Sequence, residues 1–410
     1  MGSDHTAGSH NARRATLLSG LTILDLTQVM AGPYCTMVLA DLGADVIKVE
    51  NPESGDQIRH SWGRPSAADD SRAFMALNRN KRSVALDLKS DAGRQRFYSL
   101  VRSADVVIEN FRPGVPAQLG IDYATLSAIN PALIMASISG FGQDGPYADR
   151  PGFDLIAQAM AGVMSVTGEP GGRPVKSGLP ISDLGAGLFA AVGILAAWNA
   201  RQQTGEGQYL ETSLFEAALA LSVWESVEYW STGTVPQALG SAHRMSAPYQ
   251  ALATRDGYIT VGANNQRLWQ RLCTALGVDE LAEDARFATN PDRMANLAEL
   301  EQLLEGHLAA RDTDEWVDIL LAAGVPAGPI QNYRQLLGSD LQDGSQGDPH
   351  VRHRGMVSSF EHPTAGTVPV VSSPLRFSGS GPAEHRYAPL LGEHTEEVLR
   401  ALMNLDEQDV

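Results

Sequence analysis

Two aspartates stand where a polar segment gives way to a predicted helix. Asp183 follows the Gly- and Pro-punctuated segment 174–182 and directly precedes an apolar, small-residue run, Leu184–Trp198. Asp154 follows Pro-Gly-Phe at the start of a second helical pattern. An aspartate at such a junction usually caps its helix by accepting hydrogen bonds from free N–H groups. A carboxylate there can also attack an electrophile or take up a proton, so the residues alone leave both chemistries open.

Cations that could hold an anionic ligand are few in this acidic chain. The run Asn78-Arg-Asn-Lys-Arg82 places three cations within four residues, just before a predicted strand. Such a run is usually a solvated turn, but here it is also a candidate phosphate site. Lys89 ends the following strand, on the side where parallel sheets usually bind ligands.

Several familiar catalytic motifs are absent from the sequence. The ten histidines are scattered, and no H-E-x-x-H occurs, so we expect no metal site. No G-x-G-x-x-G follows the first predicted strand, and there is no Walker loop or G-x-S-x-G elbow. The residues therefore predict a ligand cleft with two carboxylates at helix starts, without naming a reaction.

The order of apolar runs predicts an α/β fold. Strand–helix–strand units with short turns indicate a Rossmann-like parallel sheet covered by helices. The predicted strands are 22–26, 45–50, 83–88, 105–109, 133–138 and 208–214, and the predicted helices are 34–42, 90–102, 184–198 and 215–231. Farther along, the chain predicts a hairpin at 247–262 with an Asp256-Gly257 turn, helices at 266–276, 292–311 and 313–323, a strand pattern at 364–377 and a closing helix from 390 to 399.

The length of 410 residues predicts two domains, because a single simple core rarely grows so large. We expect a flexible leader at 1–17 and the N-terminal part of a large α/β domain at 18–224. A smaller α+β domain would occupy 225–335, and 336–410 would be a linker followed by a segment that returns to the large domain.

Charge and hydropathy exclude several classes of partner. A net charge of −17 argues against nucleic acid and anionic membranes, which attract basic surfaces. The most apolar run, Leu184–Trp198, has 15 residues, whereas a membrane span needs about 20, so it predicts a buried helix. Cys35 and Cys273 lie far apart and suit two buried thiols better than one disulfide. We expect a cytoplasmic protein with no membrane partner.

Five ordered motifs resemble the class III CoA-transferases, a family that includes formyl-CoA transferase, carnitine CoA-transferase and the α-methylacyl-CoA racemases. They are Leu26-Thr-Gln-Val-Met-Ala-Gly-Pro33, Gly43-Ala-Asp-Val-Ile-Lys-Val-Glu50, Asn80-Lys-Arg-Ser83, Asp105-Val-Val-Ile-Glu-Asn-Phe-Arg-Pro-Gly114 and Pro389-Leu-Leu-Gly-Glu-His-Thr395. Further stretches, among them Ile181-Ser-Asp-Leu-Gly-Ala-Gly187 and Ala247-Pro-Tyr-Gln-Ala251, look most like the succinyl-CoA-dependent dicarboxylate transferases.

The resemblance implies that Asp183 is the nucleophile and that coenzyme A or acyl-CoA is a substrate, with no tightly bound cofactor. The carboxylate would attack the acyl-CoA thioester, giving a mixed anhydride and then an aspartyl-CoA thioester that the acceptor acid opens. The CoA-lining positions of the family are matched by Ala31, Leu86, Lys89, Asn110 and Phe111. Gln28 and Met30 are also expected to line the CoA site. Together with Asn51 and Gln118 they stand where formyl-CoA transferase has His, Gln, Arg and Arg, which argues against formyl or oxalyl specificity.

Other implications of the resemblance concern specificity and assembly. The loop Gly240–Ser246 replaces the glycine-rich loop of formyl-CoA transferase, and its His243 and Arg244 are candidates to meet the distal carboxylate of a dicarboxylic substrate, against a plain surface turn. In the racemase branch an aspartate at the position of Asp154 moves a proton beside a His, which is Phe153 here. A non-catalytic CoA-binding protein is a third reading. The family architecture implies an interlocked homodimer.

Overall fold

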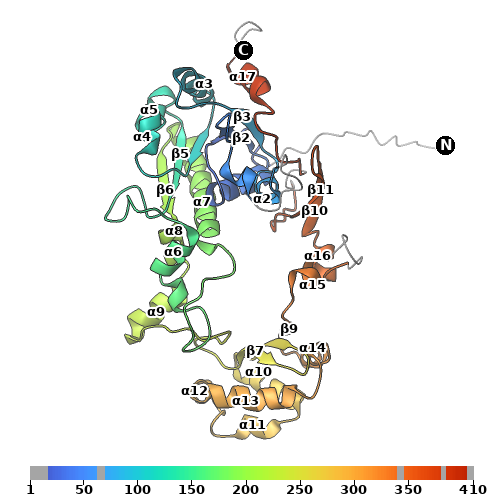
Figure 1. Cartoon of the computed structure of the whole chain (residues 1–410). Coiled ribbons are helices and arrows are strands. Elements are labelled where there is room, and N and C mark those ends of the chain that lie inside the picture. The colour runs from blue at the N-terminus through green and yellow to red at the C-terminus, as the bar shows by residue number, and fades with distance from the viewer. Residues whose placement is uncertain (1–16, 62–69, 339–345, 380–384, 404–410) are drawn as a thin grey trace, which may run out of the picture. The chain divides into compact units, whose positions relative to one another are not determined.

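The computed structural model describes residues 17–61, 70–338, 346–379 and 385–403. The chain forms two compact units (Figure 1). The first comprises Met1–Val163, Ser177–Trp224 and His353–Val410, and the second comprises Met164–Lys176 and Glu225–Arg352. The domain boundaries expected from the sequence, including those of the leader at 1–17, stay a prediction, and residues 1–16 lie outside the described part.

The first unit is built on a six-stranded sheet in the order β3-β2-β1-β4-β5-β6, and every neighbouring pair is parallel. This arrangement confirms the predicted α/β fold. The order changes direction between β1 and β4, and open α/β sheets bind ligands where strand order reverses, at the carboxyl ends of the strands. The strands are β1 Thr22–Asp25, β2 Asp45–Glu50, β3 Arg82–Ala85, β4 Val106–Glu109, β5 Ile134–Ser139 and β6 Tyr209–Ser213.

Helices cover both faces of this sheet, as alternating strands and helices require. One face packs against α1 (Ala31–Asp41) and α7 (Ile181–Thr204). The other packs against α3 (Asp91–Val101), α5 (Tyr123–Ile129) and α17 (Thr395–Met403). The remaining elements of this unit are a 3-10 turn at Gln57–His60, α2 Arg72–Leu77, α4 Val115–Leu119, α6 Asp154–Met160, α8 Leu214–Ala220 and the hairpin of β10 Val357–His362 and β11 Gly366–Val371. The boundaries between the two units fall within the 3-10 turn Val163–Ser165, within α9 Val223–Thr232 and within α16 Pro349–His353.

Glycine at 187 lets α7 cross α1 at close range. A Cβ at this position would lie 2.6 Å from the carbonyl oxygen of Ala31. The small residues that begin α7 therefore allow the backbones of two helices to approach. Among the described residues, α7 alone is long and apolar enough to cross a membrane by length and composition, and the buried core helix of a soluble protein passes the same test. Its alanines do pack on the sheet.

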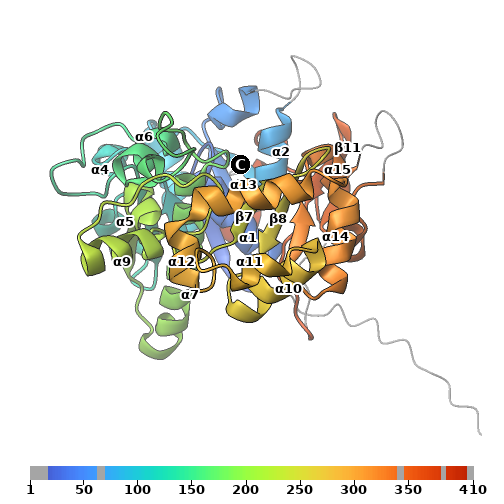
Figure 2. The same ribbon diagram turned by 90° about the horizontal axis from the view of Figure 1, so that it is seen from below.

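The second unit is an antiparallel sheet with helices on one face (Figure 2). Its strands are β7 Tyr249–Ala253, β8 Tyr258–Gly262 and β9 Ala327–Pro329, and β7 and β8 form the predicted hairpin across Asp256-Gly257. Its helices are α10 Gln266–Leu276, α11 Asp279–Glu283, α12 Asn290–Ala295, α13 Leu297–Leu308, α14 Thr313–Ala322 and α15 Tyr333–Leu337.

Several predicted element boundaries were wrong, among them the start of the closing helix, which was expected at 390 and lies at Thr395. The helix expected at 292–311 is divided at Asn296, which leaves helical geometry at a φ of −113°. The helix expected at 215–231 is divided at Ser222, whose hydroxyl donates to the Leu219 carbonyl at 2.6 Å. The strand expected at 364–377 corresponds to β11 alone, the second strand of a hairpin whose first strand is β10. The helix expected after Asp183 begins at Ile181, so Asp183 lies inside its first turn.

A buried network of charges holds the turn that follows β1. Lys81 Nζ lies 3.0 Å from an oxygen of Asp25, and Lys48 Nζ lies 2.9 Å from Oδ2 of Asp56. Burial opposes the ionisation of Asp25, but Lys81 and Lys48 hold its pKa below the ordinary value. Burial lowers the pKa of Lys81 to about 8, although Asp25 counteracts this. These four side chains fasten β1, β2, the turn before β3 and the segment before Gln57 to one another.

The same network fixes the backbone from Thr27 to Val29. The Thr27 carbonyl accepts from Lys48 Nζ at 2.7 Å, and the Val29 N–H donates to Asp56 Oδ1 at 3.1 Å. Val29 has a φ of 72°, which is rare for a β-branched residue and is kept only where neighbours over-determine it. The side chain of Asn110 completes the hold, since it accepts from the Gln28 N–H at 2.9 Å and donates to the Gln28 carbonyl at 2.8 Å.

The cationic run at 78–82 has neither of its predicted roles. Arg79 pairs with Asp41 at 2.6 Å, Lys81 with Asp25, and Arg82 with Asp45 at 2.6 Å. Asn78, Arg79, Asn80 and Lys81 are buried. The run is therefore a structural clamp with its charges already paired, and the expectation of a solvated turn or a phosphate site was wrong.

Replacement of Lys48 by Met tests the network. It leaves Asp56 as an unpaired buried charge, so we expect the free energy of unfolding to fall by about 3 kcal/mol, measured by denaturant titration. Addition of Asp56→Asn should restore part of this loss, because the unpaired charge disappears while Oδ1 still accepts from Val29. The control Arg400→Met removes the exposed pair with Glu396 and should cost less than about 0.5 kcal/mol. Equal losses in Lys48→Met and Arg400→Met would contradict this account of the turn.

Candidate active site

A pocket of about 450 Å³ lies in the first unit at the carboxyl ends of β1, β4 and β5. Gln28, Met30 and Ala31 line it from the turn after β1, and Asn110 and Phe111 line it from the turn after β4. Asp154 and Asp183 also line it. The pocket is therefore the crevice that the reversal of strand order predicts, and it joins both candidate carboxylates to five of the predicted CoA-lining residues.

Asp183 sits in the first turn of α7 without a hydrogen-bond partner among the described residues. The residue before the helix is Pro180, and no side chain caps this end from within the helix. Burial, and then the charge of Asp154, raise the pKa of Asp183 to about 7. An unpaired, partly desolvated carboxylate is more basic and more reactive than a solvated one. Asp183 is therefore not the cap of its helix, which was one of the roles that the residues alone left open.

Asp154 has the opposite environment, although it lines the same pocket. Its Oδ1 accepts from the Ser182 N–H at 3.0 Å, and its Oδ2 accepts from Gln158 Nε2 at 2.8 Å. Asp154 is the first residue of α6, so it caps α7 from a neighbouring helix instead of capping its own. Both of its oxygens are occupied, and its charge lies close enough to Asp183 to influence it.

Glu109 supports the same pocket indirectly, through the turn after β4. It is fully buried at the end of β4, and its Oε2 accepts from the Phe111 N–H at 2.7 Å. Burial raises the pKa of Glu109 to about 7, against the hydrogen bonds from Ser137 and the Phe111 backbone that lower it. Glu109 is thus a second carboxyl group that titrates near neutral pH, and it holds the turn that carries Asn110 and Phe111.

Two of the predicted CoA-binding residues lie outside the pocket lining. Leu86 is buried in the core between the sheet and α3. Lys89 is exposed in the turn before α3, where its N–H donates to Asp87 at 3.0 Å. The Asn110 amide is engaged on both sides by the backbone of Gln28. The binding roles assigned to these residues stay predictions.

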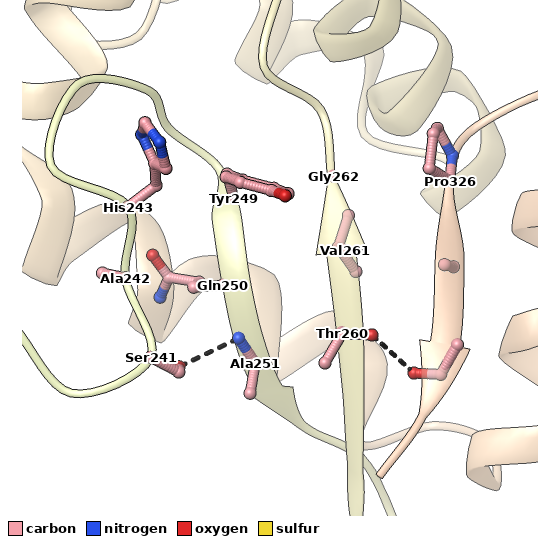
Figure 3. A pocket seen from close by; sticks show the side chains of 12 residues that line it. Ser241, Ala242, His243, Tyr249, Gln250, Ala251, Thr260, Val261, Gly262 and Pro326 are labelled. Atoms are coloured by element: carbon pink, nitrogen blue, oxygen red, sulfur yellow. Dashed lines mark hydrogen bonds between the residues drawn. The ribbon is translucent and has the colours of Figure 1, made fainter. Parts of the chain in front are cut away.

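His243 and Arg244 belong to the second unit. A cavity of about 590 Å³ there runs along β7, β8 and β9 (Figure 3), with the His243 and Tyr249 rings 5.1 Å apart. His243 Nδ1 accepts from the Met245 N–H at 3.1 Å. Arg244 pairs with Glu225 at 3.2 Å and with Glu228 at 3.1 Å. Because two carboxylates already neutralise Arg244, its predicted contact with a substrate carboxylate would require breaking both pairs.

Sequence reasoning missed the charged residues that position the pocket. Lys48 is flanked by apolar residues in a strand that is buried on both faces. A lysine in that setting must have a buried partner, and this anomaly could have been noticed. Its partner Asp56 had no distinguishing pattern. Among the residues that the structure describes, no cluster of His, Cys, Asp and Glu could hold a metal ion.

Replacement of Asp183 by Asn should stabilise the protein at high pH. The folded-state pKa of about 7 lies above the ordinary value of 3.8, so the cost of the wild-type carboxyl group grows between pH 3.8 and 7 and is full above 7. We expect a gain of up to about 4 kcal/mol in unfolding free energy at pH 8, and little difference at pH 4. Denaturant titrations of both proteins at the two pH values measure this. An equal stability difference at both pH values would show that Asp183 is not strained by burial.

Comparison with known proteins now assigns the chain to a family. Residues 18–395 match the family model described as CoA-transferase family III. The chain is 38% identical over 390 residues to succinyl-CoA:glutarate CoA-transferase of Mus musculus, covering 95% of this chain and 87% of that protein. It is 40% identical over 390 residues to succinyl-CoA:mesaconate CoA-transferase of Haloarcula hispanica, covering 93% and 95%. The crystal structure of a CAIB/BAIF family protein from Brucella suis superposes with a TM-score of 0.82 at 39% identity, covering 94% and 99%. This protein is an enzyme of the CoA-transferase family III.

Proposed function

We propose that this enzyme moves CoA from succinyl-CoA, or a similar short-chain thioester, to a carboxylic or dicarboxylic acid. The observation that carries the proposal is the environment of Asp183. Its carboxylate has no hydrogen-bond partner among the described residues, and it lines the pocket at the carboxyl ends of β1, β4 and β5 beside predicted CoA-lining residues. The relatives named for succinyl-CoA and a dicarboxylate support this substrate class.

The proposed reaction exchanges one activated acyl bond for another. The Asp183 carboxylate attacks the thioester carbonyl, the C–S bond breaks, and CoA leaves as the thiolate, forming a mixed anhydride. The thiolate then attacks the aspartyl carbonyl, which releases the donor acid and leaves an aspartyl-CoA thioester. The acceptor carboxylate attacks this thioester, the C–S bond breaks, and a second mixed anhydride forms while CoA leaves as the thiolate. The thiolate then attacks the acceptor carbonyl of this anhydride, which forms the acceptor-CoA thioester and frees the Asp183 carboxylate. Because acyl activation is kept throughout, the cycle needs no ATP and no tightly bound cofactor.

The different environments of the two aspartates suit this division of labour. Asp183 has free oxygens and a raised pKa, which favours nucleophilic attack once it is ionised. Asp154 fixes the start of α7 through Ser182 and keeps the Asp183 carboxylate basic. The alternative, racemisation with Asp154 as base, is less well supported because both Asp154 oxygens already accept hydrogen bonds and Phe153 replaces the family's His. A non-catalytic CoA-binding protein would have no use for a reactive Asp183.

We also propose a homodimer with the interlocked arrangement that the family resemblance implies. Apolar side chains stand exposed on α7, with Leu188 at 46%, Phe189 at 44% and Val192 at 64% exposure. An apolar face of this kind usually marks an interface. A cytoplasmic location and the absence of nucleic-acid or membrane partners agree with the net charge of −17 and remain part of the proposal.

Intact-protein mass spectrometry tests the covalent mechanism. After incubation with succinyl-CoA, we expect an adduct that hydroxylamine converts to a hydroxamate at Asp183. The Asp183→Ala variant should lack the adduct and lose at least roughly 10³-fold in turnover, as other covalent enzymes do without their nucleophile. If no adduct forms with short-chain acyl-CoAs while a 2-methylacyl-CoA exchanges its α-proton for deuterium, the racemase alternative replaces this proposal.

The pH dependence of kcat/KM tests the role of Asp154. Activity should fall as pH drops through the Asp183 pKa of about 7, because the protonated carboxyl group is not a nucleophile. Asp154→Asn removes the nearby charge that raises this pKa, so the acid limb should move to lower pH. Glu109 titrates in the same range, and Glu109→Gln is therefore the control, which should leave the limb in place. If the acid limb moves in Glu109→Gln but not in Asp154→Asn, the limb reports Glu109, and its assignment to Asp183 is wrong.

A further inference from the structure

A dicarboxylate substrate poses an electrostatic problem for this pocket. Asp154 and Asp183 both line it, and the substrate brings a distal carboxylate that takes no part in the reaction. In a partly desolvated crevice of a chain with a net charge of −17, like charges repel strongly unless a cation lies between them. If the proposed function is right, a cation must meet the distal carboxylate.

The described residues that line the pocket include two cations, Arg112 and Arg150. Arg112 directly follows Asn110 and Phe111, on the turn that the family resemblance assigns to CoA, and CoA carries phosphates that also need cations. Arg150 lies four residues before Asp154, on the segment that leads into α6. The positions of the two arginines therefore place Arg150 with the reacting carboxylates and Arg112 with the CoA side.

Arg150 is free to accept a ligand. Its side chain pairs with no carboxylate among residues 17–61, 70–338, 346–379 and 385–403, whereas Arg59, Arg79 and Arg201 all do. The guanidinium lies over the Tyr147 ring, with Cζ 3.9 Å from the centroid, and the Arg150 N–H donates to the Tyr147 carbonyl at 2.9 Å. Stacking on an aromatic face orients the guanidinium plane and leaves its N–H edge open, which is the geometry that binds a carboxylate bidentately.

The chain between Arg150 and Asp154 is anchored to the sheet. A Cβ on Gly152 would lie 2.5 Å from the Gly140 Cα, so the two glycines allow the segment to pack directly against the end of β5. Asp154 is in turn tied to Ser182. Arg150 therefore lies two residues before a point where the chain packs against the end of β5.

We propose that Arg150 binds the distal carboxylate of the dicarboxylic substrate and is the specificity-determining residue for dicarboxylates over monocarboxylates. This inference rests on the proposed function. It assigns the distal carboxylate to the first unit, in place of the earlier prediction of His243 and Arg244, whose arginine is already paired twice.

The test compares two donors that differ only in the distal group, succinyl-CoA and butyryl-CoA, with one acceptor held constant. Arg150→Gln should lower kcat/KM for succinyl-CoA by roughly 10- to 100-fold, because succinyl-CoA loses a charge-assisted contact with its distal carboxylate. The kcat/KM for butyryl-CoA, which has no distal carboxylate, should change by less than about threefold. Arg150→Lys keeps the positive charge but lacks the planar guanidinium that can bind a carboxylate through two hydrogen bonds. It should therefore recover part of the preference for succinyl-CoA over butyryl-CoA. Arg112→Gln is the matched control and should lower both values by the same factor.

The outcomes separate this inference from the proposed function. A wild-type enzyme that transfers CoA but does not distinguish the two donors overturns the inference alone. The inference is also overturned if Arg150→Gln lowers kcat/KM for succinyl-CoA and butyryl-CoA equally, or if the preference for succinyl-CoA is lost only in Arg112→Gln. If wild-type protein transfers CoA from neither donor and forms no Asp183 adduct, the proposed function itself fails. Thermal unfolding of each variant establishes that the compared proteins are folded.

Discussion

The pocket depends on two buried ion pairs, Asp25 with Lys81 and Lys48 with Asp56. Burying charges is costly, and apolar residues of similar volume would often stabilise a fold as well or better. What apolar residues could not do is donate to the Thr27 carbonyl and accept from the Val29 N–H at the same time. The pairs therefore serve to hold one strained turn, and that turn supplies the wall from Gln28 to Ala31.

The two aspartates show how environment separates residues of one type. Asp154 has hydrogen-bond partners on both oxygens and stabilises the start of α7. Asp183, one residue beyond Ser182, has none among the described residues and is left partly desolvated beside a like charge. Such an arrangement lowers stability, and proteins commonly accept that loss where a reactive group is needed. The position that looks like an ordinary helix cap is thus the least stabilised carboxylate of the pocket.

The sequence supported the fold more firmly than the details of the site. Alternating strand and helix patterns require a parallel sheet covered on both faces, whatever the side chains at its edge do. Helix ends such as Asn296 and Ser222 escaped prediction because a local side-chain hydrogen bond or a single backbone angle decides them. The run from Asn78 to Arg82 was misread because its partners, Asp41, Asp25 and Asp45, lie more than thirty residues away in the chain.

By itself, the sequence determined the α/β class and the hairpin at Asp256-Gly257, because these follow from local periodicity and turn chemistry. The family and the candidate nucleophile came from the resemblance of its motifs to a known family. Only the tertiary structure decided which charges are free. Arg244 and Arg79 are paired, Asp154 is hydrogen-bonded, and Asp183 and Arg150 are left open to the pocket. The reason is physical: whether a charged side chain can meet a substrate depends on partners brought to it by folding, and chain spacing carries no information about them.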